Sequence, residues 1–158
     1  RFFILEEKTH SQNSISAICD ICANVNIDSS TLMIVEKDSD LESIRKSRVY
    51  NGKYFILGGL VPIVEKNTKS RVRIEELKNK IKTANTEARP QRLLKEIILA
   101  FSISPQGNHT DQYIREQIKD LCEKQNIKIS SLGKGLSTGT ELEYSDNDTL
   151  ENALKNRQ

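Results

Sequence analysis

The sequence lacks the features that identify a membrane-bound or secreted protein. No apolar run approaches the roughly 18 residues that a membrane-spanning helix needs, and the apolar opening, RFFIL, is too short for a signal peptide. There are only three cysteines, an odd and sparse set that is typical of a reducing compartment. We therefore expect a cytoplasmic protein that does not act in a membrane.

Strong net charge and aromatic side chains are also scarce. The net charge is +2 and there is no Trp, so bulk charge barely favours nucleic acid. The 158 residues, 36% of them hydrophobic, suit one globular domain with at most a small appendage. The first residue is Arg rather than Met, so we expect the chain to be part of a longer protein.

Four short apolar segments predict four β-strands: residues 31–37, 53–59, 95–101 and 127–132. Helical spacing of apolar residues follows each of the first three strands, and the predicted inward positions are Leu41, Ile44, Ile74, Leu77, Ile81, Tyr113, Ile114, Ile118 and Leu121. Asp38 or Asp40 and Asn108 or Thr110 are the expected N-caps of two of these helices. A last helix, DTLENALKN, is predicted to open with a capping box formed by Asp148 and Glu151.

Alternating strands and helices favour an α/β fold with a parallel four-stranded sheet flanked by helices. Right-handed crossovers place the carboxyl ends of all strands at one edge, where such sheets bind ligands. The segments expected there are Glu36, the Gly58-Gly59 turn, the loop 102–110 and the Gly-rich stretch 133–139. We expect Gly58, Gly59, Gly135 and Gly139 to serve turns at strand ends.

The expected edge contains few catalytic groups. Glu36 could hold Mg²⁺ or act as a general acid or base, or it could be a solvated residue at a strand end. The loop 102–110 contains Gln106, Asn108 and His109 but no Asp or Glu. His109 has no Cys or carboxylate arranged with it, which favours a polar residue in the first turn of a helix over nucleophilic catalysis.

Cys19 and Cys22 form a C-x-x-C pair, the spacing of one knuckle of a zinc site. Two further ligands would be needed, and Glu7 and His10 are the upstream candidates with similar spacing. The alternative is a remnant knuckle that binds nothing tightly, while a thioredoxin-like site is disfavoured because no strand precedes the pair. Cys122 lies in a predicted helix, where we expect a small buried apolar group.

Basic residues form two clusters that could contact phosphates: Arg45, Lys46, Arg48 and Lys53, and then Lys66, Lys69, Arg71 and Arg73. No aromatic residues for base stacking are interleaved with them. Acidic residues nearby make a solvated surface the default interpretation.

Four segments in order, MIVEKDSDLESI, GKYFILGGLVPI, EIILAFSISPQGNHT and GKGLSTGTELEYSDNDTLENAL, resemble the bacterial RecR family of recombination mediators over residues 30–157. The resemblance implies a Toprim domain at 30–137 and a C-terminal segment and helix at 138–158. It also implies that residues 1–29 are a degenerate four-cysteine zinc-finger region. The family's helix-hairpin-helix region is missing or truncated.

The resemblance also implies roles for the edge residues. Toprim domains carry a Glu at the end of the first strand, here Glu36, and acids in the loop after the third. Typical RecR proteins read like VEGEAT in that loop, whereas this chain has PQGNHT, so the acids are replaced by Gln106 and Asn108. We therefore expect a vestigial metal site at Glu36, Gln106 and Asn108, with magnesium unlikely to bind because two charges are lost.

The family's zinc finger is reduced to one Cys pair here, and two alignments are open. If Cys19 and Cys22 are the second knuckle, Glu7 and His10 fall where the first cysteines should be, and a mixed site is chemically possible. If they are the first knuckle, the second has been deleted and no site remains. We expect no tightly held zinc, and Cys19, Cys22 and His10 are the candidate ligands if zinc is bound.

The function implied by the resemblance is a non-enzymatic role in DNA repair and recombination. The chain would bind DNA, act with RecO and RecF at single-stranded gaps, and help to load RecA, as a homo-oligomer and without a small-molecule substrate. The alternative is a Toprim nuclease that uses Glu36 and Mg²⁺, which a single carboxylate does not support. A third interpretation is a partial sequence without an activity of its own.

Overall fold

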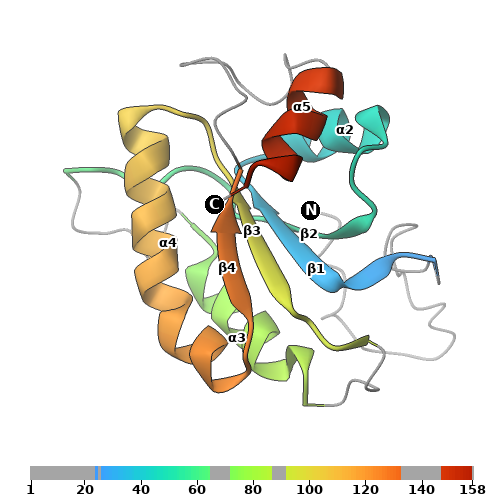
Figure 1. Cartoon of the computed structure of the whole chain (residues 1–158). Coiled ribbons are helices and arrows are strands. Elements are labelled where there is room, and N and C mark those ends of the chain that lie inside the picture. Colours follow the sequence, from blue (N-terminus) through green and yellow to red (C-terminus); the bar gives the residue numbers. More distant parts are fainter. Residues whose placement is uncertain (1–23, 25, 65–71, 87–91, 133–146, 158) are drawn as a thin grey trace, which may run out of the picture.

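The protein's structure, a computed structural model, describes residues 24, 26–64, 72–86, 92–132 and 147–157 (Figure 1). Its elements in chain order are β1 (Asp28–Val35), α2 (Asp38–Ser47), β2 (Gly52–Ile56), α3 (Ile74–Ala84), β3 (Glu96–Ala100), α4 (Pro105–Lys124), β4 (Lys128–Ser131) and α5 (Asn147–Lys155). Residues 1–23 lie outside this description, so the predicted zinc-finger region, with Glu7, His10, Cys19 and Cys22, stays a prediction. The same holds for Gly135 and Gly139.

The four strands form one parallel sheet in the order β2-β1-β3-β4. Val35 at the end of β1 pairs with Ile56 on one side and with Ala100 on the other, so these three strands end together. The predicted α/β fold with a four-stranded parallel sheet is confirmed. The strand bounds differ by a few residues, because β1 begins three residues before the expected start and β2 stops before the Gly pair.

The two faces of the sheet carry separate apolar cores. Leu32 and Ile34 point to the face covered by α3 and α4, and Met33 and Val35 point to the face covered by α2 and α5 (Figure 1). Because both faces are buried, the strands are continuously apolar rather than alternating. This explains why the apolar runs in the sequence locate the strands.

Strand order accounts for the placement of the helices. The chain moves from β1 to β2 in one direction and from β2 through β3 to β4 in the other. Right-handed crossovers that run in opposite directions place their helices on opposite faces. Hence α2 covers one face and α3 and α4 the other, and α5 returns to the face of α2, where Leu150 and Ala153 join Leu41 and Ile44 in the core.

The predicted inward residues of the helices are confirmed. Leu41, Ile44, Ile74, Leu77, Ile81, Ile114 and Ile118 are all buried, and Tyr113 and Leu121 pack against the core at its margin. Cys122 is buried as expected, and this burial raises the pKa of its thiol to about 11. No helix in the described part of the chain has both the length and the apolar character to cross a membrane.

The predicted helix starts are wrong in detail. α2 begins at Asp38 after Lys37 as N-cap, and Asp40 is its third residue, whose carboxylate accepts a hydrogen bond from the Lys37 N–H at 3.3 Å. Asp40 therefore closes a capping box from the N3 position instead of providing the cap. α5 begins at Asn147, so Asp148 lies inside its first turn and not at its cap.

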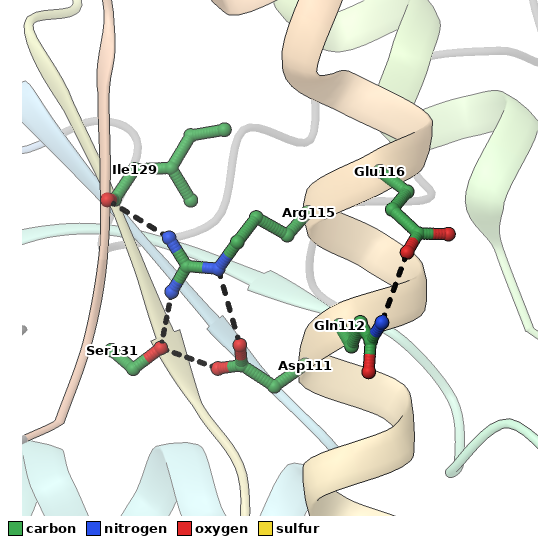
Figure 2. A network of polar contacts seen from close by, with 6 residues as sticks. All are labelled: Asp111, Gln112, Arg115, Glu116, Ile129 and Ser131. Atoms are coloured by element: carbon green, nitrogen blue, oxygen red, sulfur yellow. Dashed lines mark hydrogen bonds and ion pairs between the residues drawn. The ribbon is translucent and has the colours of Figure 1, made fainter.

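The outer strand β4 is joined to α4 by a polar network (Figure 2). The N–H groups of Lys128 and Leu132 donate to the Lys95 and Leu99 carbonyls. Because the peptide groups of alternate residues in a strand point to opposite sides, those of Ile129 point away from β3. Arg115 Nη1 donates to the Ile129 carbonyl at 3.2 Å, and its Nη2 donates to Ser131 Oγ at 2.6 Å. The Asp111 carboxylate accepts from Ser131 Oγ and from Arg115 Nε, so both of its oxygens have a hydrogen-bond partner.

Candidate functional site: the carboxyl edge of the sheet

The carboxyl ends of β1 and β3 define the candidate site. The segment after β1 leaves toward α2 on one face, and the segment after β3 leaves toward α4 on the opposite face (Figure 1). This divergence of adjacent strands is the switch point at which open parallel sheets bind ligands. Glu36 follows β1, and Phe101 and Ser102 follow β3, so all three lie beside this point.

The main chain of Glu36 is held by the end of β2. The Gly58 N–H donates to the Glu36 carbonyl at 2.9 Å, and the Leu57 N–H donates to the Val35 carbonyl at 2.8 Å. Gly58 has a φ of 93° and Gly59 a φ of 153°, conformations that favour glycine, so their predicted turn role is confirmed. The left-handed turn lets the chain leave β2 without disturbing the backbone that positions Glu36.

The segment predicted as the loop 102–110 is mostly helix. α4 begins at Pro105 with Ser104 as its N-cap, whose hydroxyl accepts a hydrogen bond from the Gly107 N–H at 3.0 Å. The prediction that Asn108 or Thr110 caps this helix is therefore wrong. Ser followed by Pro is a strong helix start, because the Ser side chain caps the helix and Pro at N1 has no N–H to satisfy.

Gly107 is required by a close approach of two main-chain segments. A Cβ atom at this position would lie 2.0 Å from the Ser102 carbonyl oxygen. Gly107 is buried in the first turn of α4. The absence of a side chain thus lets the end of the β3 segment fold tightly against the helix start.

Thr110 couples the segments that follow β2 and β3. It is fully buried, its hydroxyl donates to the Gln106 carbonyl at 2.8 Å, and it accepts from the Val61 N–H at 2.9 Å. An unpaired buried N–H would be costly, so this bond fixes the segment after the Gly58-Gly59 turn against α4. Sequence reasoning assigned Thr110 to capping and missed this role.

Gln106 and Asn108 lie in the first turn of α4, and both are exposed. His109 is partly buried and is the fifth helical residue, so it lies in the second turn and not the first as expected. Among the described residues no group of three His, Cys, Asp or Glu side chains could hold a metal ion. Glu36 is the one carboxylate among the three residues of the predicted metal site, and the vestigial character of that site stays a prediction.

The predicted basic clusters are only partly described. Arg45, Lys46 and Arg48 are exposed around the end of α2. Arg73 has a structural role: its guanidinium lies 5.0 Å from the centre of the Phe55 ring and pairs with Glu76. This pairing lowers the pKa of Glu76. Residues 65–71 lie outside the described residues, so a phosphate contact by the second cluster stays a prediction.

Two families match the chain in adjacent regions. The Toprim domain family matches residues 30–133, which include β2, β3, β4 and all of β1 except its first two residues. The family described as RecR, C-terminal, matches residues 135–158, which include α5.

Curated relatives are similar along most of the chain. "Recombination protein RecR" of Lactobacillus acidophilus is 34% identical over 140 residues, which are 89% of this chain and 65% of that protein. The protein of the same name from Bacteroides thetaiotaomicron is 34% identical over 88% of this chain and 62% of its own length. That of Flavobacterium psychrophilum is 34% identical over 96% and 67%.

The chain thus spans about two thirds of the length of the curated relatives that it matches. Similarity of this extent, together with the two domain matches, shows that the chain belongs to the RecR family of recombination proteins and contains its Toprim domain.

Proposed function

We propose that this protein is a non-catalytic recombination mediator in DNA repair. In this role it binds DNA and acts in the cytoplasm with RecO- and RecF-type proteins to help load RecA-type recombinase at single-stranded gaps. Membership of the RecR family supports the role in recombination. The non-catalytic part rests on the neutral side chains of Gln106 and Asn108 in the first turn of α4, where the family resemblance leads us to expect acids.

The chemistry of the edge supports this proposal. Metal-assisted cleavage of a phosphodiester normally uses several carboxylates to hold one or two ions. Here the first turn of α4 has no acidic residue. Its main-chain N–H groups are engaged by Ser104, whose hydroxyl accepts from Gly107 and whose carbonyl accepts from Asn108. The first turn of α4 is therefore a capped helix start that contains no carboxylate.

One experiment separates the mediator from the alternative, a Toprim nuclease that depends on Glu36 and Mg²⁺. Purified protein is incubated with supercoiled plasmid and Mg²⁺, and binding and nicking are measured on the same gel. We expect a shift of the plasmid without nicking. Nicking that disappears in the Glu36→Gln variant would overturn the mediator role.

Partner binding needs its own test. We expect the protein to co-purify with a RecO-type protein and to increase RecA-type filament formation on single-stranded DNA coated with single-strand-binding protein. Size-exclusion chromatography with light scattering should give a mass above that of one chain if the proposed homo-oligomer forms. The proposed assembly is contradicted if the protein does not co-purify with the RecO-type protein, does not increase filament formation and has the mass of one chain.

The proposal includes no tightly bound zinc, because Cys19 and Cys22 provide only two thiolates and structural zinc sites normally have four ligands. Metal analysis of the purified chain should find zinc far below one ion per chain. Stoichiometric zinc that is lost in the Cys19→Ser and His10→Ala variants would contradict this and favour the mixed ligand set.

A further inference from the structure

The end of α2 presents two cations to solvent. Lys46 lies in the last turn of this helix and Arg48 is its C-cap residue, and both are exposed. Within the described part of the chain, neither side chain has a hydrogen-bond or ion-pair partner. Arg45 in the same turn does have an interaction, so it is not counted with them. The positive charges of Lys46 and Arg48 are therefore open to a ligand.

Arg48 has a backbone conformation that does not suit its side chain. Its φ is 57° and its ψ is 18°, which is left-handed. This conformation brings a Cβ too close to the following carbonyl oxygen, so glycine is the usual residue just after a helix. Apart from glycines, Asn126 is the one other described residue with positive φ, and asparagine visits this region routinely. The backbone alone would therefore favour glycine at position 48.

The helix end does not need the Arg48 side chain as a cap. The Arg48 N–H donates to the Arg45 carbonyl at 3.2 Å. The hydroxyl of the buried Ser47 donates to the Ile44 carbonyl at 2.6 Å. Two carbonyls of the last turn are thus satisfied without a cation. A cation is favourable near the negative end of the helix dipole, but Lys46 already lies there. The contacts of α2 therefore do not account for an arginine at position 48.

The chemistry of this pair fits a phosphate group. Arginine has a planar fork of donors that matches phosphate oxygens, and the lysine two positions earlier adds a second positive charge. An exposed guanidinium can contact the backbone of a nucleic acid without reading its bases. Carboxylates also fit arginine, but DNA presents a dense and regular row of phosphates, and this chain belongs to a family of recombination proteins.

We propose that Arg48, together with Lys46, contacts the phosphate backbone of DNA at the end of α2. This inference rests on the proposed function and deepens it, because it assigns one DNA contact to a named surface. α2 begins two residues after Glu36 and ends four residues before β2, so this surface lies at the end of the helix that is remote from the predicted metal site.

Arg48→Gly tests the site, because a DNA contact and a structural role predict different outcomes. Binding of a labelled single-stranded oligonucleotide to the 158-residue chain is measured by fluorescence anisotropy at several salt concentrations. We expect about fivefold weaker binding and a slope of log affinity against log salt that is shallower by about 0.7, as for one phosphate contact to a single strand. The melting temperature should stay the same or rise by up to about 4 °C, because glycine tolerates the left-handed backbone. Unchanged affinity, or weaker binding together with a lower melting temperature, would overturn the proposal.

Two matched controls separate this contact from a change in backbone or a general loss of charge. Asn126→Gly makes a similar backbone change just after α4, where φ is 53°, and should change the affinity less than about twofold. Lys46→Gln should weaken binding about threefold, whereas Lys82→Gln, which removes an exposed lysine from the last turn of α3, should change it less than about twofold. Equal effects of the two lysine variants would overturn the assignment of the contact to α2.

The anion that reaches Arg48 is identified by separate titrations. The side-chain Nε–H signal of Arg48 is followed by nuclear magnetic resonance with inorganic phosphate and with the oligonucleotide, and we expect both to shift it. A shift with inorganic phosphate alone would overturn DNA as the source. An Arg48→Gly variant that binds the oligonucleotide normally but no longer co-purifies with the RecO-type protein would overturn the proposal in favour of an acidic protein segment.

Failure of the proposed function gives a different result. If the parent chain binds no oligonucleotide and retards no plasmid, DNA binding by this chain is excluded and the contact at α2 is excluded with it. If the parent chain binds DNA and Arg48→Gly binds it equally well, only the contact at α2 is overturned and the proposed function stands.

Discussion

Arg157 donates to both carboxylate oxygens of Glu96, from Nε at 2.7 Å and from Nη2 at 3.0 Å, although the two residues are 61 positions apart. Glu96 is the first residue of β3, and Ser130 Oγ on β4 also donates to it at 2.5 Å. Arg157 in turn donates from Nη1 to the Leu154 carbonyl at the end of α5. The pair therefore fastens α5 to the amino ends of β3 and β4.

This pair should make stability depend on pH. The hydrogen bonds from Arg157 hold the pKa of Glu96 below its usual 4.5, so the unfolded state binds more protons than the folded state as the pH falls below that value. The stabilisation is present above about 4.5 and is lost as the pH falls through the folded pKa. We expect Glu96→Gln to lower the free energy of unfolding by about 1–2 kcal/mol at neutral pH.

Urea unfolding of the parent and the variant measures this difference. The difference should become smaller as the pH falls through the lowered pKa of Glu96, because Glu96 is then protonated in the parent too. Arg157→Gln should give a loss similar to that of Glu96→Gln, and the double variant should lose less than the sum. A difference that stays constant from pH 7 down to the lowest pH at which the parent is still folded would contradict the role of the ion pair.

The hydrogen bond from Val61 to Thr110 predicts a second effect on stability. Thr110→Val keeps the shape of the side chain but leaves the Val61 N–H without its acceptor, so it should cost about 1–2 kcal/mol. Amide hydrogen exchange of Val61 should also become faster. Thr83→Val is the control, because Thr83 is exposed and its hydroxyl donates to carbonyls of its own helix. Equal losses in the two variants would argue against the buried contact.

Two glycines at the carboxyl edge should respond to alanine for different reasons. Gly107→Ala places a Cβ 2.0 Å from the Ser102 carbonyl oxygen, so we expect a loss of about 2–3 kcal/mol. Gly58→Ala has space, since its nearest neighbours are Arg73 side-chain atoms at 3.9 Å, but its φ of 93° is unfavourable, and about 1–2 kcal/mol should be lost. Thermal and urea unfolding would show which variant loses more stability. A Gly107→Ala variant with unchanged stability would exclude the close approach.

Restoring acids at the two amide positions should create a cation site. Gln106→Glu/Asn108→Glu adds two negative charges to the first turn of α4, at the same edge of the sheet as Glu36, and should raise Mg²⁺ affinity at least about tenfold in calorimetric titration. The control Asn79→Asp/Gln112→Glu adds the same charge on exposed positions of α3 and α4. We expect no plasmid cleavage by the restored variant; cleavage would show that the loss of these acids alone had silenced a nuclease.

Cys122 should be inert in the folded protein. Its pKa of about 11 implies about a hundredfold less thiolate near neutral pH than for an ordinary thiol of pKa 9.0, and its burial blocks access. In the Cys19→Ser/Cys22→Ser variant, a thiol reagent should modify Cys122 only after urea is added. Rapid modification of the native variant would show that α4 opens far more readily than its contacts suggest.

The strands were predictable because a sheet buried on both faces requires continuous apolar runs, as in Leu32–Val35 and Ile97–Leu99. The start of α4 was also present in the sequence, as Ser104 before Pro105, but the polar composition of the segment favoured a loop. Polar residues suit an exposed first turn as well as a loop, so composition alone could not distinguish the two. The cap and N1 residues are the stronger signal.

The contacts that organise the carboxyl edge and α5 were beyond sequence reasoning. Thr110 is hydrogen-bonded to Val61, which lies 49 positions away in the sequence, and Glu96 is hydrogen-bonded to Arg157, which lies 61 positions away. Local periodicity in the sequence cannot predict such pairs, because they depend on which segments the strand order and the helix placement bring together. The position of Glu36 at the end of the first strand was predictable, since it needs only the strand and the rule that ligands lie at carboxyl ends.

The hydrogen bond from Arg115 to the Ile129 carbonyl bears on aggregation at high protein concentration. β4 ends the described sheet, and an unprotected outer strand invites a strand from a neighbouring molecule, which is a common start of aggregation. Here an incoming strand would have to displace a guanidinium that is already engaged by Ser131 and Asp111. The same network that attaches α4 to β4 thus occupies a carbonyl of the outer strand that an incoming strand would need.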